Sequence, residues 1–95
     1  MELTDMRRVT VVLPSYNPDE KLQKTVASLL AVGFTDLVVV NDGSRADTEK
    51  FFPAEDEHIT VLRHAVNRGK GAALKTAFQY VLDNCPDSTG VVTVD

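Results

Sequence analysis

The chain has 95 residues, of which 43% are hydrophobic and 25% are charged, and its net charge is −4. This composition is typical of one soluble globular domain, here residues 1–95, and the acidic balance argues against nucleic acid as a partner, because phosphate binding needs a basic surface. The one cysteine, Cys85, cannot form an internal disulfide, and neither a membrane-spanning run nor a signal peptide is recognisable. We therefore expect a cytoplasmic protein, with the cytoplasmic face of a membrane as the alternative for the full-length protein.

The first predicted elements are a buried strand and a helix that follows it closely. Residues 9–13 are apolar or β-branched without interruption, a pattern typical of a parallel strand that is covered on both faces. Pro14 is expected to stop this strand because it has no backbone N–H. Asn17 is the expected N-cap of a helix over 18–32, whose apolar residues recur at helical spacing, and Gly33 is expected to end that helix.

The rest of the chain repeats this alternation. A second buried strand is predicted over 37–40, a short helix over 46–52 and a third strand over 59–63. A helix with one apolar face then precedes a fourth strand over 91–94. This order predicts an α/β fold with an open, parallel, four-stranded, Rossmann-like sheet in the strand order 3-2-1-4. All four strands then end at one edge, which is where open α/β sheets bind ligands.

The second strand leads into the turn Asn41, Asp42, Gly43 and Ser44. Such a turn can be purely structural, because Asn, Asp and Gly tolerate tight backbones. Alternatively, Asp42 accepts hydrogen bonds from a base or sugar that lies across the edge, and Gly43 lets the backbone come close to that ligand. Because Asp42 is predicted to lie in a loop, we expect the fold to survive its replacement.

A second candidate site is the glycine-rich turn 67–71, which leads into the last helix. Backbone N–H groups, the helix dipole and two basic side chains favour a bound anion there, although such residues also occur in ordinary connections. The turn lacks the Walker A spacing. The first strand is also not followed by Gly-x-Gly-x-x-Gly, which disfavours a dinucleotide-binding Rossmann domain.

Three further side chains allow more than one interpretation. Tyr16, in the turn after the first strand, is either a core aromatic residue or a platform against which a base stacks. His64 is expected to finish the third strand and His58 to lie on the surface, and neither is assigned a catalytic role. Cys85 is expected to be a plain residue of a loop or a helix end rather than a nucleophile.

Taken together, these segments resemble the nucleotide-binding half of the family 2 glycosyltransferases, which have the GT-A fold. The matching segments occur in the order VVLPSYNPDEKL, LVVVNDGSRADT, NRGKGAALKTAF and VVTVD, and they cover residues 9–95. The resemblance implies that a sugar is transferred from a UDP- or GDP-linked donor to an acceptor. It also implies a divalent metal, Mg²⁺ or Mn²⁺, that stabilises the departing diphosphate.

The resemblance also implies which residues bind the nucleotide. The turn after the first strand and the Asp-Gly-Ser turn would hold the nucleoside, through Pro14, Ser15, Tyr16, Asn17, Asp42 and Gly43. The Gly-Lys-Gly segment would lie near the base and diphosphate, through Arg68, Gly69, Lys70 and Gly71. Asp95 matches the first acid of an Asp-x-Asp motif, and is therefore the implied ligand of the ribose and of the metal.

The chain departs from the family pattern in three places. Asn41 stands where the family often has an acid, and Pro18 stands where an acid commonly follows Tyr-Asn. The sequence ends at Asp95, before the second acid, the acceptor-binding half and the catalytic base. We therefore expect these 95 residues alone to be inactive and to self-associate through the exposed strand 91–94. Two other functions remain open: a nucleotide-sugar-binding module without transferase activity, and a nucleotidyltransferase-like relative.

Overall fold

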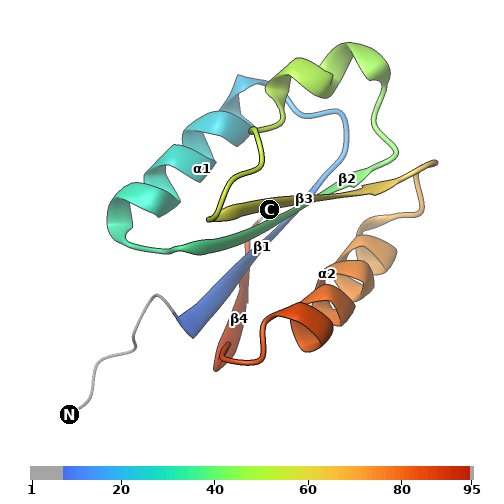
Figure 1. Cartoon of the computed structure of the whole chain (residues 1–95). Helices are drawn as coiled ribbons and strands as arrows, with labels where there is room; N and C mark the ends of the chain where they lie inside the picture. The colour runs from blue at the N-terminus through green and yellow to red at the C-terminus, as the bar shows by residue number, and fades with distance from the viewer. Residues whose placement is uncertain (1–7, 95) are drawn as a thin grey trace.

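The fold is an open parallel sheet with helices on both faces, seen in a computed structural model that describes residues 8–94 (Figure 1). Its elements, in chain order, are β1 (Val9–Ser15), α1 (Glu20–Val32), β2 (Asp36–Asp42), the 3₁₀ helix η2 (Ala46–Phe51), β3 (Ile59–His64), α2 (Lys70–Asn84) and β4 (Gly90–Thr93). The sheet order is β3-β2-β1-β4, and every pair of neighbouring strands is parallel. The predicted α/β class and strand order are therefore confirmed.

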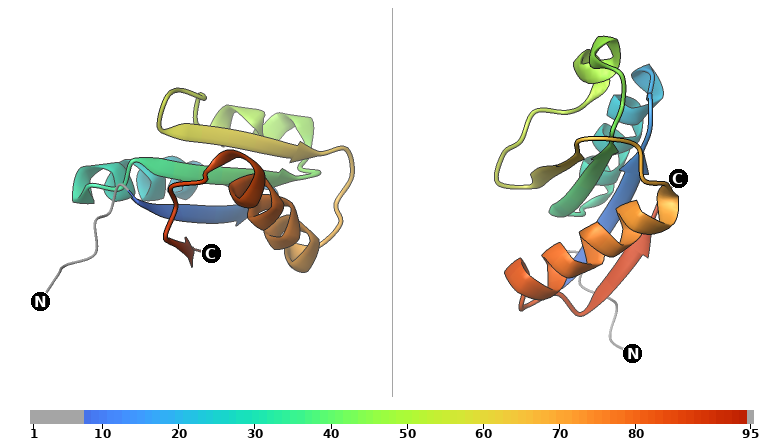
Figure 2. Two further views of the ribbon diagram at one scale, coloured as in Figure 1. Left: turned by 60° about the horizontal axis from the view of Figure 1, so that its bottom comes forward. Right: turned by 90° about the vertical axis from the view of Figure 1, so that its right-hand side faces the viewer.

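The two faces of the sheet are covered by different helices. Side chains alternate along a strand, so Val11 and Leu13 of β1 belong to the cluster that contains α1 and Phe52, the residue after η2, whereas Val12 belongs to the cluster that contains α2. The same division in β2 places Val38 and Val40 against two alanines of α2. Figure 2 shows α1 and α2 on opposite sides of the sheet. Burial on both faces explains why β1 and β2 read as uninterrupted apolar runs.

The end of β1 differs from the prediction. Pro14 does not stop the strand, because β1 continues through it to Ser15, and Pro14 is paired in register with Val40 of β2. The amide of Val94 donates to the carbonyl of Val12, so even-numbered residues of β1 direct their backbone groups towards β4. Pro14 has the same orientation but lies beyond the end of that pairing, where its missing N–H interrupts no ladder bond.

The start of α1 also differs from the prediction. The helix begins at Glu20, and its N-cap is Asp19, whose carboxylate accepts a hydrogen bond from the amide of Lys21 at 2.9 Å. Asn17, the predicted cap, instead has a positive φ of 48°, a conformation that asparagine tolerates better than most residues. The predicted end at Gly33 is confirmed, since its φ is 121° and its N–H donates to carbonyls of the last helical turn.

Cys85 lies at the C-terminal end of α2, where its amide donates to the carbonyl of Val81, as predicted for a residue of a helix end. Burial raises the pKa of its thiol, and the negative charge of Asp36 raises it further. The reactive thiolate is therefore disfavoured. Neither helix within residues 8–94 has the length and apolar character needed to cross a membrane.

Candidate functional site

Three turns meet at the edge where β1, β2 and β3 end. They connect β1 to α1, β2 to η2, and β3 to α2, and parallel pairing brings them together although they are far apart in the sequence (Figure 1). Within residues 8–94, no buried side-chain nitrogen or oxygen lacks a hydrogen-bond partner. The polar groups of the turns are therefore largely engaged with one another.

The first two turns are joined by Asn17. Its amide donates to the hydroxyl of Ser44 at 2.8 Å, and its side-chain oxygen accepts from the amide of Arg45 at 2.8 Å. The side-chain oxygen of Asn41 accepts from the amide of Ser44 at 3.0 Å, and this bond stabilises the second turn. Asn17 thus fixes the first two turns against each other, and Asn41 stabilises the second turn internally. The predicted contact of Asn17 with a nucleoside stays a prediction.

The second and third turns are joined by Asp42. This residue is the last of β2 rather than part of a loop, and only 3% of its surface is exposed. One carboxylate oxygen lies 2.8 Å from Nδ1 of His64 and 2.9 Å from the amide of Arg68. The other accepts from the side chain of Asn67 at 3.0 Å and from the amide of Gly69 at 2.9 Å. The four acceptor positions of a carboxylate are therefore filled by the protein itself.

These contacts keep Asp42 ionised. Burial alone raises the pKa of the carboxyl group, but hydrogen bonds from His64, Arg68 and Gly69 outweigh that effect and hold the pKa below its ordinary value of 3.8. The carboxylate also lies at the N-terminal end of α2, where the helix dipole favours a negative charge. The anion expected at this helix end is thus, in part, a side chain of the protein.

Gly43 is required by the approach of another segment of the chain. Its φ is 68°, and a Cβ at this position would collide with the backbone of Val66 and Asn67. The space that was expected to admit a ligand is thus filled by the third turn. Contact between Gly43 and a nucleotide stays a prediction.

The sequence did not reveal that His64 belongs to the network of side chains at this edge. It ends β3 as predicted, but its ring is buried, with only 5% of the side chain exposed, and it contacts both Asp42 and the hydroxyl of Thr76. The signal that could have found it is its register: it pairs with Asp42 on the neighbouring strand. His58, by contrast, is partly exposed at the other end of β3.

A cavity of about 300 Å³ lies between these turns and the start of α2. This volume is at the lower end of the range for small-molecule sites. It is lined by residues of β1, its following turn, β2, the third turn and α2, namely Pro14, Ser15, Tyr16, Asp42, Asn67, Lys70 and Ala73. The structure therefore brings five of the predicted site residues to one cavity.

The other predicted residues within 8–94 do not line this cavity. Arg68 and Gly69 donate their amides to Asp42. Gly71 lies in the first turn of α2 with open space beside it. Asp95, the predicted metal ligand, lies outside the described residues. Residues 8–94 contain no group of three or more His, Cys, Asp and Glu side chains that could hold a metal ion.

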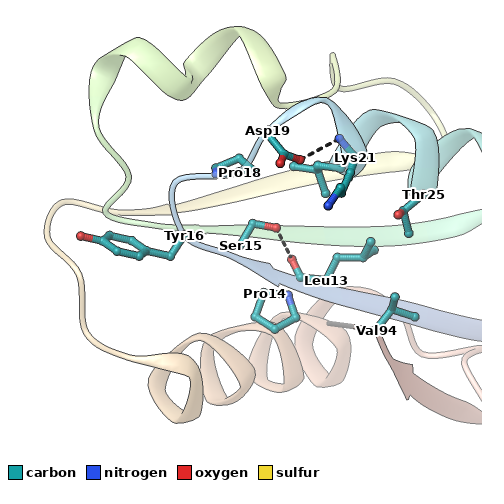
Figure 3. A pocket seen from close by; sticks show the side chains of 10 residues that line it. Leu13, Pro14, Ser15, Tyr16, Pro18, Asp19, Lys21, Thr25 and Val94 are labelled. Carbon is teal, nitrogen blue, oxygen red and sulfur yellow. Dashed lines mark hydrogen bonds between the residues drawn. The ribbon is translucent and has the colours of Figure 1, made fainter.

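A second cavity, of about 230 Å³, lies on the α1 side of the end of β1 (Figure 3). It shares Pro14, Ser15 and Tyr16 with the first cavity, and its remaining lining includes Thr25 of α1 and Val94. Figure 3 shows the hydroxyl of Ser15 directed to the carbonyl of Leu13, at 3.5 Å. The end of β1 thus separates two hollows, of which only the one facing α2 contains Asp42 and Lys70.

The lowered pKa of Asp42 predicts a specific dependence of stability on pH. Its stabilising contribution should be fully present above the ordinary carboxyl pKa of 3.8 and be lost as the pH falls through the lower folded-state value. Asp42→Asn should lower the free energy of unfolding near neutral pH by about 3 kcal/mol, because it leaves a buried network broken. Its unfolding free energy should then decline less than that of the wild type below pH 3.8, because only the contribution of Asp42 is removed, while that of Glu49, whose pKa is lowered by its hydrogen bond with Arg63, remains.

Chemical denaturation from neutral pH to below pH 3.8 would measure the unfolding free energies of the wild type and of Asp42→Asn. Asp47→Asn makes the same chemical change at a carboxylate whose side chain is 72% exposed, and it should keep the wild-type profile. Equal profiles for wild type and Asp42→Asn would show that the buried carboxylate does not stabilise the fold.

Gly43 and Gly71 offer a matched pair of glycine substitutions. Gly43→Ala should lower the free energy of unfolding by about 3 kcal/mol, because the new Cβ meets backbone and φ is positive. Gly71→Ala should leave it unchanged or raise it by up to about 1 kcal/mol, because the site is helical and open. Thermal unfolding of both variants would test this, and equal effects would contradict the close approach at Gly43.

Comparison with known proteins gives the family. The sequence model for "Glycosyl transferase family 2" matches residues 10–85. Uncharacterized protein MJ1222 of Methanocaldococcus jannaschii is 36% identical over 74 residues, which are 78% of this chain and 30% of that protein. Dolichyl-phosphate beta-glucosyltransferase ALG5A of Trichomonas vaginalis is 31% identical over 86 residues, covering 77% of this chain and 27% of that protein.

A third relative is poly-beta-1,6-N-acetyl-D-glucosamine synthase of Staphylococcus epidermidis, which is 29% identical over 96 residues, covering 92% of this chain and 23% of that protein. No solved structure matches the chain significantly. The chain spans less than a third of the length of these relatives, at 30%, 27% and 23%. The family match covers most of the chain and includes all three turns that surround the cavity. The chain therefore belongs to glycosyl transferase family 2.

Proposed function

We propose that this chain is the donor-binding half of a glycosyltransferase, which transfers a sugar from a nucleoside-diphosphate donor to an acceptor. The observation that carries the proposal is the cavity beside β1, which Tyr16, Asp42 and Lys70 line from three separate segments of a family 2 chain. Its position at the carboxyl ends of parallel strands is the usual place for a ligand in an open α/β sheet.

The lining residues suggest how the donor would bind. Tyr16 is 55% exposed at the rim of the cavity, so one side of its ring is available for a base to stack on. Lys70 brings a positive charge to the first turn of α2, where the helix dipole adds to the attraction for a diphosphate. Asp42 contributes mainly by holding the turn that carries Asn67, because its acceptor positions are already occupied.

The remaining features of the proposal rest on family resemblance. Asp95 would contribute to a site for Mg²⁺ or Mn²⁺, which supplies electrostatic stabilisation of the departing diphosphate when it is bound. The donor base would be uracil or guanine. The free thiol of Cys85 is compatible with a cytoplasmic location.

Nucleotide titration tests the proposal directly. UDP and GDP added to the protein should shift the amide resonances of residues 15–17, 41–44 and 67–71. Tyr16→Ala should weaken binding of the preferred nucleotide by about 1–3 kcal/mol through loss of stacking, whereas Tyr16→Phe should retain most of it. Tyr80→Phe is the matched control, because Tyr80 lies in α2, packs against the cluster between α2 and the sheet, and does not line the cavity.

The outcomes separate binding from transfer. Shifts confined to the opposite edge of the sheet, or no shifts at millimolar nucleotide, would exclude the donor site. Transfer of radiolabelled sugar by the full-length protein would support the glycosyltransferase function, whereas binding without transfer or donor hydrolysis would favour a non-catalytic module.

We also propose that the chain self-associates through β4. Within residues 8–94 this strand pairs only with β1, and Val91 and Val92 are exposed. An unpaired apolar edge favours pairing with a second copy. Val92→Lys should therefore lower the mass measured by light scattering at high concentration. Val66→Lys, the same change at an exposed valine in a turn, should not, and a monomeric wild type would refute the proposal.

A further inference from the structure

His64 connects three elements at the base of the cavity. Its backbone ends β3, and its ring lies between the end of β2 and the middle of α2. Nδ1 is 2.8 Å from the carboxylate of Asp42, and Nε2 is 2.8 Å from the hydroxyl of Thr76. Both ring nitrogens are thus engaged inside the protein, and the ring does not line the cavity.

The chemistry of the two partners fixes where the ring carries a proton. An ionised carboxylate can only accept a hydrogen bond, so Nδ1 must be protonated and donate to Asp42. In the neutral ring, Nε2 then accepts from the hydroxyl of Thr76, and in the charged ring it donates to the same oxygen. The Nδ1–H···carboxylate bond is therefore present in either charge state.

That bond sets the orientation of the carboxylate plane. The oxygen that accepts from His64 also accepts from the amide of Arg68, and the other oxygen accepts from the amide of Gly69 and the side chain of Asn67. A rotation of the carboxylate would break several of these bonds together. The turn they hold carries Asn67 and leads into Lys70, both of which line the cavity.

We propose that His64 is a positioning residue for nucleotide binding: by donating from Nδ1 to Asp42 it orients the carboxylate that shapes the turn 67–69. This inference rests on the proposed function, since it assigns His64 a role in the same cavity. His64 does not touch the nucleotide. Its effect passes through Asp42 to the turn.

Three substitutions separate positioning from general support of the fold. In His64→Asn the side-chain amide nitrogen takes nearly the place of Nδ1 and keeps the bond to Asp42. In His64→Gln the amide reaches towards Thr76 instead, and His64→Leu makes neither bond. His58→Asn is the matched control, because His58 contacts the carbonyl of Thr35 at the opposite end of β3.

The measurements are the affinity for UDP and GDP and the hydrogen exchange of the Arg68 and Gly69 amides, made on the full-length protein. His64→Gln and His64→Leu should bind the preferred nucleotide about tenfold more weakly and exchange these two amides about tenfold faster. His64→Asn should remain close to wild type in both measurements, as should His58→Asn. Nitrogen-15 spectra of the wild-type ring should show a protonated Nδ1.

Each alternative result has a distinct meaning. If the Asn and Gln variants lose affinity equally, or neither loses any, the bond to Asp42 is not what positions the turn and the proposal is overturned. An unprotonated Nδ1 would also overturn it. If the wild type binds neither nucleotide, the proposed function fails, while the exchange of the Arg68 and Gly69 amides still decides whether His64 orders the turn.

Discussion

The carboxylate of Asp42 is a full negative charge with only 3% of the residue exposed to solvent. A charge removed from water costs several kcal/mol unless good hydrogen bonds replace its hydration. Here the replacement comes from a histidine of β3, a side-chain amide, and two backbone N–H groups at the start of α2. These four donors come from segments that follow Asp42 by more than 20 residues, so the charge can be satisfied only in the assembled fold. The geometry of the candidate site depends on that condition.

This dependence divides the site residues into two groups. Asn17, Asp42 and Gly43 contact the protein's own backbone and fix the three turns relative to one another, although Asp42 also lines the cavity. Tyr16 and Lys70 line the same cavity from the turn after β1 and from the first turn of α2. Turns that are fixed by hydrogen bonds and that carry accessible cavity residues favour binding, because a preorganised site loses less conformational entropy when the ligand binds. Residues that fix the turns would thus affect binding even where they do not contact the ligand.

The sequence was informative about the fold because burial on both faces leaves a simple signal. Continuous apolar runs such as residues 9–13 and 37–40 identify parallel strands, and alternation with helices fixes their order. The errors at Pro14 and Asn17 share another cause. Local preference alone predicts a strand end at Pro14 and a helix cap at Asn17, whereas in the structure Pro14 lies beyond the end of β4 and Asn17 holds a turn 28 residues away. Such tertiary contacts override local preference and leave no trace in residue spacing.

His64 and Gly43 illustrate the same limit at the site itself. A single histidine at a strand end has no distinguishing sequence pattern. Its contact with Asp42 becomes visible only when parallel pairing places the two residues side by side. Gly43 was recognised as a residue that permits close approach, but the approaching group is the backbone of Val66 and Asn67. A motif of the kind Asp-Gly-Ser therefore combines two constraints, one from the ligand and one from the fold. At residues 42 and 43 the fold alone already requires a buried anion and a residue without a side chain, so under the proposed function the base would be recognised mainly by exposed residues of the cavity such as Tyr16.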